Sequence, residues 1–293
     1  MKILKLSSIH LILVRKFIFS DLIEKSNMES EITNKESRRK VTFIVLISII
    51  SVLILYYSIM SMISPVRKLE KIKNEFGNKT TGKSEVNKRI LTDSTYIDLL
   101  KEKAFLQSRI VMAETDSIYL TINLADSTVN IEISGVVVHR AKMSRVQTSK
   151  LLTKGNENII LSMLASPFTI SHSYATIKKE PVMIKMAPKD TSEYKPDIMP
   201  DTSITEPVNY ILEMTGGTRI YVYQEENVKF KDRMSRLNFD IKDRLRDTWR
   251  SLKSVAVLKV PDYHPYIKMR LPRTDAKIIF RAIPKNGQVA VSR

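Results

Sequence analysis

The longest apolar run in the chain extends from Val41 to Ile63 and contains no charged residue. About 20 apolar residues in a helix are enough to cross the hydrocarbon core of a bilayer. A surface helix of a soluble protein shows a polar stripe, and this run has none. Basic clusters lie on both sides of it, within 38–40 and within 67–73. The pattern predicts a single transmembrane helix over 41–63, and a buried helix of a soluble protein is the less favoured alternative.

An N-terminal tail, residues 1–40, precedes this run. Its first part, 1–27, holds a short apolar stretch interrupted by basic residues, and no cleavage site with small residues follows it. Read from Met28, the chain has a short polar segment, a basic cluster and then the membrane helix. We therefore hypothesise that Met28 is the native start and that 1–27 are an upstream extension.

The membrane helix is predicted to end at Pro65, because a proline ring cannot continue the backbone hydrogen-bond ladder. We expect residues 64–92 to form a juxtamembrane linker, with a basic interfacial helix from Val66 to Phe76 followed by a polar break rich in Gly, Thr and Ser. After this linker the apolar residues recur at helical spacing, which predicts a helix over 93–113. This helix is expected to pack on the domain that follows it.

The period of the apolar residues changes to two after Ser117, which is typical of strands. Three short alternating segments separated by turns predict an antiparallel meander over 117–143. Further along, the pattern predicts a polar segment with a weak helical signal over 144–155 and a helix over 156–165. Pro181 interrupts the next apolar segment, which predicts an edge strand over 174–186. A long exposed loop is predicted over 188–207.

A hairpin is predicted over 208–224, followed by the clearest helix of the chain over 227–253. The apolar residues of this helix form one stripe, while Lys, Arg and Asp fill its other side. A basic amphipathic helix can bind a membrane surface, but we expect the stripe to cover a sheet, because strands flank the helix. The stripe consists of Phe230, Met234, Leu237, Ile241, Leu245, Trp249 and Leu252. The remaining residues predict strands over 255–260, 266–271 and 289–291 and a helix over 275–282.

Together these elements predict an α+β protein with a single N-terminal transmembrane helix. A mainly antiparallel, β-rich domain with flanking helices follows over 114–293. The dense basic cluster at 38–40 favours an inside N-terminus, which places the C-terminal domain outside the cytoplasm on the inner (plasma) membrane. Basic residues lie on both sides of the span, so a cytoplasmic domain tethered by its N-terminus is the alternative.

The composition adds a strong positive charge, with a formal net charge of +17 and a pI near 9.8. Such a balance favours anionic partners, such as phospholipid headgroups and polymers of the peptidoglycan type. The charge is spread along the chain, without an Arg-rich tail or a zinc finger. We therefore expect the lipid bilayer to be a partner and nucleic acid not to be one.

The residues that carry most enzyme chemistry are scarce. The chain has no Cys, which excludes thiol nucleophiles, disulfides and Cys-ligated zinc. It has four His, none at the spacing of a metal-binding motif, and no G-x-S-x-G sequence. No pair of carboxylates is placed by a recognisable acid–base motif. The sequence therefore predicts no metal, no cofactor and no enzymatic activity.

The segment 263–291 carries a resemblance to a known family. It reads YHPYIKMR over 263–270 and TDAKIIFRAIPKNGQVAV over 274–291. This resembles the end of L,D-transpeptidases of the YkuD type, where Ser-His-Gly-Cys-Ile-Arg-Met is followed by a helix with Asp-Ala and by Val-Pro-x-Gly. The meander over 117–143 is also similar to the opening of that family.

In that family the Cys attacks a stem peptide of peptidoglycan, the His beside it belongs to the same site, and the Arg helps to hold the substrate. Here Tyr266 stands in the place that matches the Cys, and Pro265 replaces the Gly. A phenol has a pKa near 10 and is a poor acyl-transfer nucleophile unless it is activated. The resemblance therefore implies a ligand site at His264, Tyr266, Lys268 and Arg270 that lacks the catalytic nucleophile.

Three functions remain open at this point. The favoured one is a membrane-anchored, non-catalytic envelope protein that binds peptidoglycan or an envelope protein through a degenerate L,D-transpeptidase-like domain. The second is a structural subunit of a membrane-associated assembly, with partners on the helices at 93–113 and 227–253 and no ligand site. The third is an enzyme with an unrecognised site near His264, His172 and neighbouring carboxylates.

Overall fold

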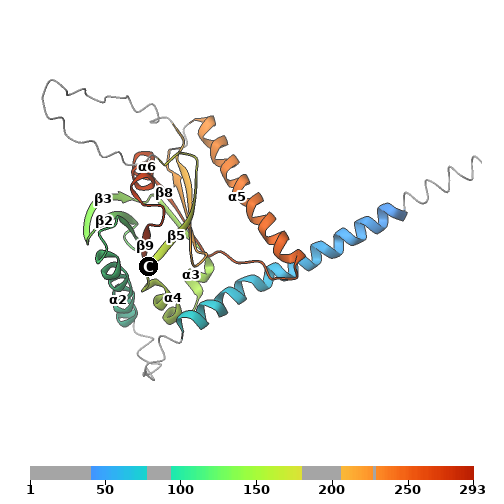
Figure 1. The fold of residues 1–293 in the computed structure, drawn as a ribbon, viewed down its shortest axis with the longest axis horizontal. Helices are drawn as coiled ribbons and strands as arrows, with labels where there is room; N and C mark the ends of the chain where they lie inside the picture. The colour runs from blue at the N-terminus through green and yellow to red at the C-terminus, as the bar shows by residue number, and fades with distance from the viewer. Residues whose placement is uncertain (1–40, 78–93, 180–205, 227–228) are drawn as a thin grey trace, which may run out of the picture. The chain divides into compact units, whose positions relative to one another are not determined.

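The computed structural model of the protein describes residues 41–77, 94–179, 206–226 and 229–293 (Figure 1). The described chain divides between Ile59 and Met60 into two units, and the strands described below belong to the second. The hypothesis about Met28 and most of the predicted loop at 188–207 lie outside the described residues.

The helix Val41–Phe76 is long and apolar enough to cross a membrane, and it includes the whole predicted span. The prediction that Pro65 ends this helix is wrong, since helical structure continues to Phe76. The helix predicted at 66–76 within the linker is confirmed, but it continues the preceding helix without a break at Pro65. The rest of that linker, from residue 78, lies outside the described residues.

The turns that follow Pro65 belong to the second unit and are stabilised by packing within it. Ile72 is buried in the main hydrophobic core, and Phe76 packs against the same core. Just before the proline, the Ser64 hydroxyl donates a hydrogen bond of 2.6 Å to the carbonyl oxygen of Pro261. A proline inside a helix costs roughly 3 kcal/mol. Burial of these apolar side chains offsets that cost, which the local sequence pattern does not reveal.

A nine-stranded sheet forms the centre of the second unit, in the order β3-β2-β1-β9-β5-β6-β7-β8-β4. The strands are β1 Tyr119–Asn123, β2 Thr128–Ile133, β3 Val136–Lys142, β4 Arg145–Thr148, β5 Phe168–Ala175, β6 Asn209–Met214, β7 Arg219–Gln224, β8 Tyr266–Leu271 and β9 Gln288–Ser292. The pairs β1–β9 and β7–β8 are parallel and the other neighbouring strands are antiparallel. The α+β class is confirmed, and the sheet is mixed.

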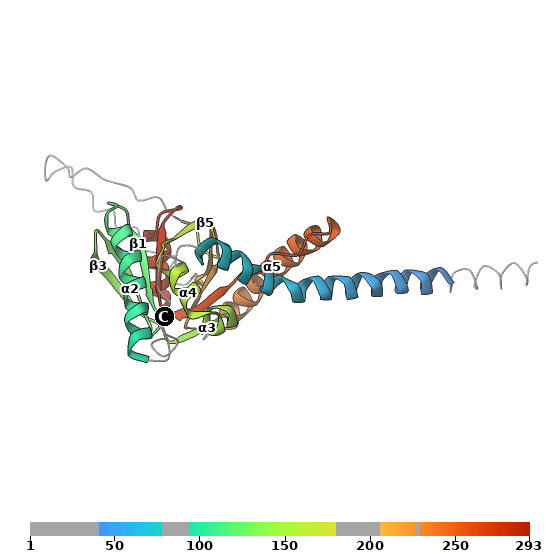
Figure 2. The same ribbon diagram turned by 90° about the horizontal axis from the view of Figure 1, so that it is seen from below.

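The other helices of this unit are α2 Ser94–Ala113, α3 Lys150–Lys154, α4 Glu157–Leu164, α5 Phe230–Ala256 and α6 Arg273–Ala282. α2 lies beside β1 and β9 at one end of the sheet, and α5 lies beside β6 and β7 towards the other end, both on the face opposite the main core (Figures 1 and 2). The predicted helices at 93–113, 156–165, 227–253 and 275–282 are thus confirmed, as are the meander and the hairpin at 208–224.

The main core lies on one face of the sheet. It combines residues of α4 and α6 with inward residues of the strands, such as Tyr210, Leu212, Val222 and Met269. Every residue of β6 and β7 is buried, because α5 covers their other face. The hairpin between these two strands turns at Gly217, whose φ of +77° is one that glycine adopts without a steric penalty.

Three local predictions differ from the structure. In its described part, the predicted edge strand at 174–186 is wrong, since β5 runs from Phe168 to Ala175 and lies between β9 and β6, while residues 180–186 lie outside the described residues. The predicted strand at 255–260 is wrong because α5 continues to Ala256 and buries Val255. A short strand, β4, was not predicted within the polar segment at 144–155 and forms an edge beside β8.

Candidate functional site

The polar surface of the sheet lies under and beside α5, on the face opposite the main core. Side chains alternate along a strand, so residues two apart share a face. This alternation places Arg219, Tyr221 and Tyr223 of β7 on the same face as Tyr266, Lys268 and Arg270 of β8. The result is a polar and aromatic face that extends across neighbouring strands.

The helix α5 contacts this face through its aspartates. The Tyr223 hydroxyl donates a hydrogen bond of 2.8 Å to Asp240, and the Tyr221 hydroxyl donates one of 3.0 Å to Asp243. Arg219 donates to Asp247, and Arg273 at the start of α6 donates to Asp232 over 2.9 Å. The four aspartates of α5 are thus bound to the domain beneath the helix.

The prediction that the apolar stripe of this helix covers the sheet is therefore wrong. Phe239 packs against Ile211, Tyr221 and Tyr223, but the seven residues of the stripe are exposed, from 49% for Met234 to 77% for Phe230. Buried tyrosines and an arginine on the sheet need hydrogen-bond partners, and the aspartates supply them. Satisfying these buried polar groups determines which face of the helix meets the sheet.

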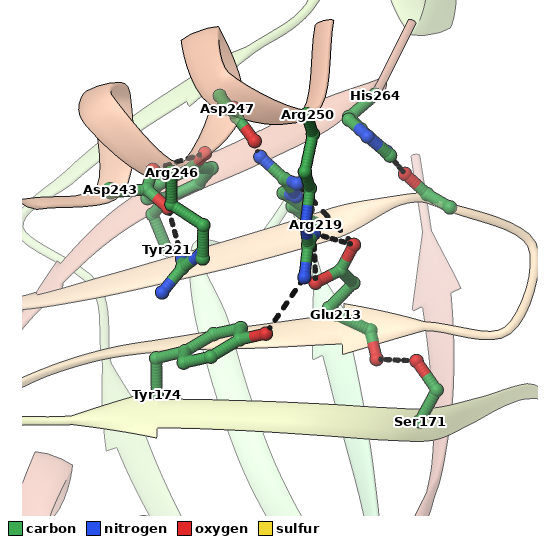
Figure 3. Close-up of polar contacts among 11 residues, drawn as sticks. Ser171, Tyr174, Glu213, Arg219, Tyr221, Asp243, Arg246, Asp247, Arg250 and His264 are labelled. Carbon is green, nitrogen blue, oxygen red and sulfur yellow. Dashed lines mark hydrogen bonds and ion pairs between the residues drawn. The ribbon is translucent and has the colours of Figure 1, made fainter. Parts of the chain in front are cut away.

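A network of charges surrounds Glu213 on β6 (Figure 3). The Glu213 carboxylate is 3.3 Å from Arg219 and 3.3 Å from Arg250, and Arg250 also donates a hydrogen bond of 3.1 Å to Tyr174. Burial alone would raise the pKa of Glu213, but the two arginines outweigh it and hold the pKa below its ordinary value. Because these charges neutralise each other, the network stabilises the packing of α5.

A cleft of about 550 Å³ opens between the C-terminal part of α5 and the sheet. It brings together three of the predicted site residues, His264, Tyr266 and Lys268. The ring of Tyr266 meets the ring of Tyr221 edge to face, with 6.4 Å between centroids. The Lys268 ammonium lies 4.9 Å from the centroids of both rings, at cation–π distance.

The His264 side chain is held by the β6–β7 turn. Its Nδ1 lies 2.8 Å from the carbonyl oxygen of Gly217, and because a carbonyl only accepts, Nδ1 carries the proton. His264 also lines a neighbouring cleft of about 760 Å³ together with His172, Lys68 and Lys71. Among the described residues, no carboxylate is hydrogen-bonded to either histidine, and no group of three His, Asp or Glu could hold a metal ion.

The fourth predicted residue, Arg270, lies in a separate groove. This cationic groove, defined by Arg145, Arg236, Lys268 and Arg270, has a volume of about 210 Å³ and is also lined by Gln147, Tyr223 and Met269. Arg145 of β4 is paired directly with Arg270 of β8, and like charges opposite each other on two strands destabilise a sheet. Burial, together with Arg236 and Arg145, lowers the pKa of Arg270.

The cations of this groove form no ion pair with a carboxylate within the described ranges, although Glu225 is close enough to offset part of the lowering of the pKa of Arg270. Arg236 lies over the ring of Tyr223 at 4.6 Å and Lys268 lies over tyrosine rings, but neither forms an ion pair there. Arg145 and Arg270 form none in those ranges either. An anion with planar oxygens, such as a carboxylate or a phosphate, matches the geometry of guanidinium groups.

Sequence reasoning found Lys268 and Arg270 but missed Arg145 and Arg236. The alternation of Arg145, Val146, Gln147 and Thr148 was the signal for β4, and it was too short to stand out. Arg236 could not be placed at the groove while the opposite face of α5 was expected to meet the sheet.

Comparison with known proteins identifies no relative from which this site could be interpreted. The proposed likeness to L,D-transpeptidases therefore stays a prediction that these comparisons do not test. No protein-family model, no curated protein and no solved structure matches this chain.

Proposed function

We propose that this protein is a membrane-anchored, non-catalytic binding protein of the cell envelope, and that it holds an anionic ligand in the cationic groove. The observation that carries the proposal is the contrast between two sets of charges. The aspartates of α5 and the buried Arg219 all have partners. The four cations of the groove form no ion pair with a carboxylate among the described residues. Repulsion between these like charges lowers the stability of the protein, and a bound anion would offset this loss by neutralising them.

The size of the groove favours a charged group of a larger molecule. Sites that enclose a whole small molecule usually have volumes of about 300–1,000 Å³, and this groove is smaller. Peptidoglycan offers carboxylates on its stem peptides, and the resemblance of 263–291 to L,D-transpeptidases favours it as the ligand. An acidic segment of an envelope protein would offer the same chemistry.

The location follows from the anchor. The helix Val41–Phe76 would hold the domain at the inner (plasma) membrane. The basic cluster at 38–40 favours a cytoplasmic N-terminus and thus an extracytoplasmic domain. In this orientation the groove would face the compartment that contains peptidoglycan.

The test is co-sedimentation of the full-length protein, in detergent micelles, with purified peptidoglycan sacculi. The double variant Arg145→Ala/Arg270→Ala should bind at least tenfold more weakly than the wild type. The matched control, Lys103→Ala/Lys142→Ala, removes the same charge from α2 and β3 and should change binding less than threefold. Equal losses in both variants would show that net charge alone drives sedimentation, and absence of wild-type binding at low salt would refute peptidoglycan as the ligand.

The enzyme, the third of the functions left open by the sequence, is supported by one observation, since His172 and His264 line the same cleft. With Nδ1 protonated, Nε2 of a neutral His264 can accept a proton. Incubation of the protein with peptidoglycan fragments, followed by mass spectrometry, tests this alternative. A product that the wild type forms and the His264→Ala variant does not form would replace the non-catalytic proposal. A structural subunit without a ligand would instead yield one defined protein partner on crosslinking and no binding to sacculi.

A further inference from the structure

The outward face of α5 carries an apolar stripe that no other described residue covers. Trp249 is 71% exposed and Leu245 is 64% exposed. The stripe extends over seven residues: Phe230, Met234, Leu237, Ile241, Leu245, Trp249 and Leu252. A helix rises about 1.5 Å per residue, so the stripe is about 33 Å long. Exposed apolar surfaces of this extent mark sites of interaction.

The charges on α5 are sorted between its two sides. All four of its aspartates bind residues of the domain beneath the helix. The exposed cations beside the stripe include Lys231, Lys242, Arg244 and Lys253, whereas Arg250 contacts Glu213 and Tyr174 of the domain. A surface that suits this face is therefore apolar inside and anionic at its boundary.

This sorting of charge argues against a second copy of α5 as the partner. Two such helices packed stripe to stripe would bring lysines and arginines together, with no outward carboxylate to neutralise them. Helices that pair through an apolar seam normally carry both signs of charge beside it. An anionic bilayer surface supplies both the apolar interior and the negative boundary.

Within the second unit, the C-terminal part of α5 lies near the end of the predicted membrane span. Arg250, Ser251 and Ser254 line the same cleft as Ser61 and Ser64. Ser61 lies within the apolar run at 41–63. The C-terminal part of α5 is thus held beside the place where the chain leaves the predicted bilayer span.

We propose that the apolar stripe of α5 lies in the interface of an anionic lipid bilayer, with the flanking lysines and arginines at the phosphates. Tryptophan is enriched at this depth, which suits the position of Trp249. The helix would act as a second attachment point, in addition to the transmembrane helix, and would fix the orientation of the domain relative to the membrane. This inference does not depend on the ligand of the cationic groove.

The single tryptophan of the chain provides a direct probe. The full-length protein is reconstituted into vesicles of 70% phosphatidylcholine and 30% phosphatidylglycerol, with and without lipids that carry a quencher near the headgroup. We expect a blue-shifted Trp249 emission and quenching at least threefold stronger than in the Ile241→Glu/Leu245→Glu variant. A matched control, Leu99→Glu/Ile110→Glu, changes exposed residues of α2 and should retain wild-type quenching. Emission typical of water, without quenching in the wild type, would overturn the proposal.

A second measurement separates lipid contact from pairing of two chains. Because the chain has no Cys, Leu245→Cys introduces the only thiol. At one protein per several thousand lipids, we expect no disulfide-linked dimer. We also expect the introduced thiol to react with a water-soluble maleimide at least fivefold more slowly in the vesicles than after the protein is dissolved in urea. Efficient dimer formation at this dilution would assign the stripe to a second copy and overturn the proposal. Correct folding of each variant is checked by its circular dichroism spectrum.

Discussion

The carboxylate of Asp247 on α5 accepts a hydrogen bond from the buried guanidinium of Arg219 on β7. Arg219 is only 1% exposed, and its other terminal nitrogen lies 3.3 Å from Glu213. A buried charge without a partner is costly, so this arginine requires carboxylates on both sides. The pair therefore determines which face of α5 turns to the sheet, and it leaves the apolar stripe outside.

Replacing Asp247 with Ala should destabilise the protein, because Arg219 would keep Glu213 as its only carboxylate partner. The side chain of Asp247 is 35% exposed, and the remaining partner limits the loss. We expect the free energy of unfolding to fall by about 2 kcal/mol. Guanidinium denaturation of the full-length protein in micelles, followed by circular dichroism, measures this change.

The matched control is Asp98→Ala on α2. Asp98 pairs with Lys101 at 2.9 Å, but its side chain is 71% exposed. Exposed pairs contribute about 0–1 kcal/mol, so this variant should stay close to the wild type. Equal losses in the two aspartate variants would contradict the structural role of the Asp247–Arg219 pair.

The charge on Glu213 should make stability depend on pH. Burial raises the pKa of Glu213, but Arg219 and Arg250 outweigh it and place the pKa below the ordinary value of 4.5. The carboxylate therefore contributes stability that is fully present above pH 4.5 and is lost as the pH falls through the folded-state pKa. Glu213→Gln should be less stable than the wild type at pH 7, and the difference should shrink below pH 4.5. Denaturation curves of both proteins at pH 7 and pH 3.5 measure it, and a difference that does not change with pH would refute this explanation.

The sequence identified α5 correctly as an amphipathic helix but not the face that it buries. Apolar periodicity predicts a helix well, and the rule that the apolar side faces the core then usually holds. Here Tyr221, Tyr223 and Arg219 of the hairpin present polar groups to the helix. Asp243 accepts a hydrogen bond from Tyr221, and Asp247 accepts one from Arg219. Such pairing joins residues about 20 to 30 positions apart, so the pattern within α5 could not show it.

The sequence predicted the site residues within β8 but not the residues that other strands and helices bring next to them. The alternation in β8 places Tyr266, Lys268 and Arg270 on one face, as the sequence indicated. The neighbours of that face depend on strand order, and β4 reaches β8 from more than 100 residues away. A helix at 66–76 was predicted, but its continuity with the apolar helix through Pro65 was not, since tertiary packing and not local preference stabilises it.

Removing a charge from the cationic groove should raise the free energy of unfolding, whereas removing the buried Arg219 should lower it. In Arg270→Gln, the charge opposite Arg145 is removed, and we expect the free energy of unfolding to rise by about 0.5 kcal/mol. Binding of the anionic ligand should weaken in the same variant. The comparison variant, Arg219→Gln, should lower stability, because it leaves Glu213 and Asp247 without their shared partner. Thermal or chemical denaturation ranks the two variants, and a loss above about 1 kcal/mol in Arg270→Gln would assign that residue a structural role.

The helical turns after Pro65 should contribute to the stability of the domain. Ile72 is 4% exposed and belongs to the main core, and replacing a buried isoleucine with alanine typically costs about 2–5 kcal/mol. We expect Ile72→Ala to lower the free energy of unfolding by about 2–3 kcal/mol. This is less than for a substitution at the centre of the sheet, because a helix at the edge of the core can shift to fill the space. Val66, which is 65% exposed on the same helix, serves as the control, and Val66→Ala should change stability by less than about 0.5 kcal/mol. If Ile72→Ala were as neutral as Val66→Ala, residues 66–76 would be a tether that does not stabilise the domain.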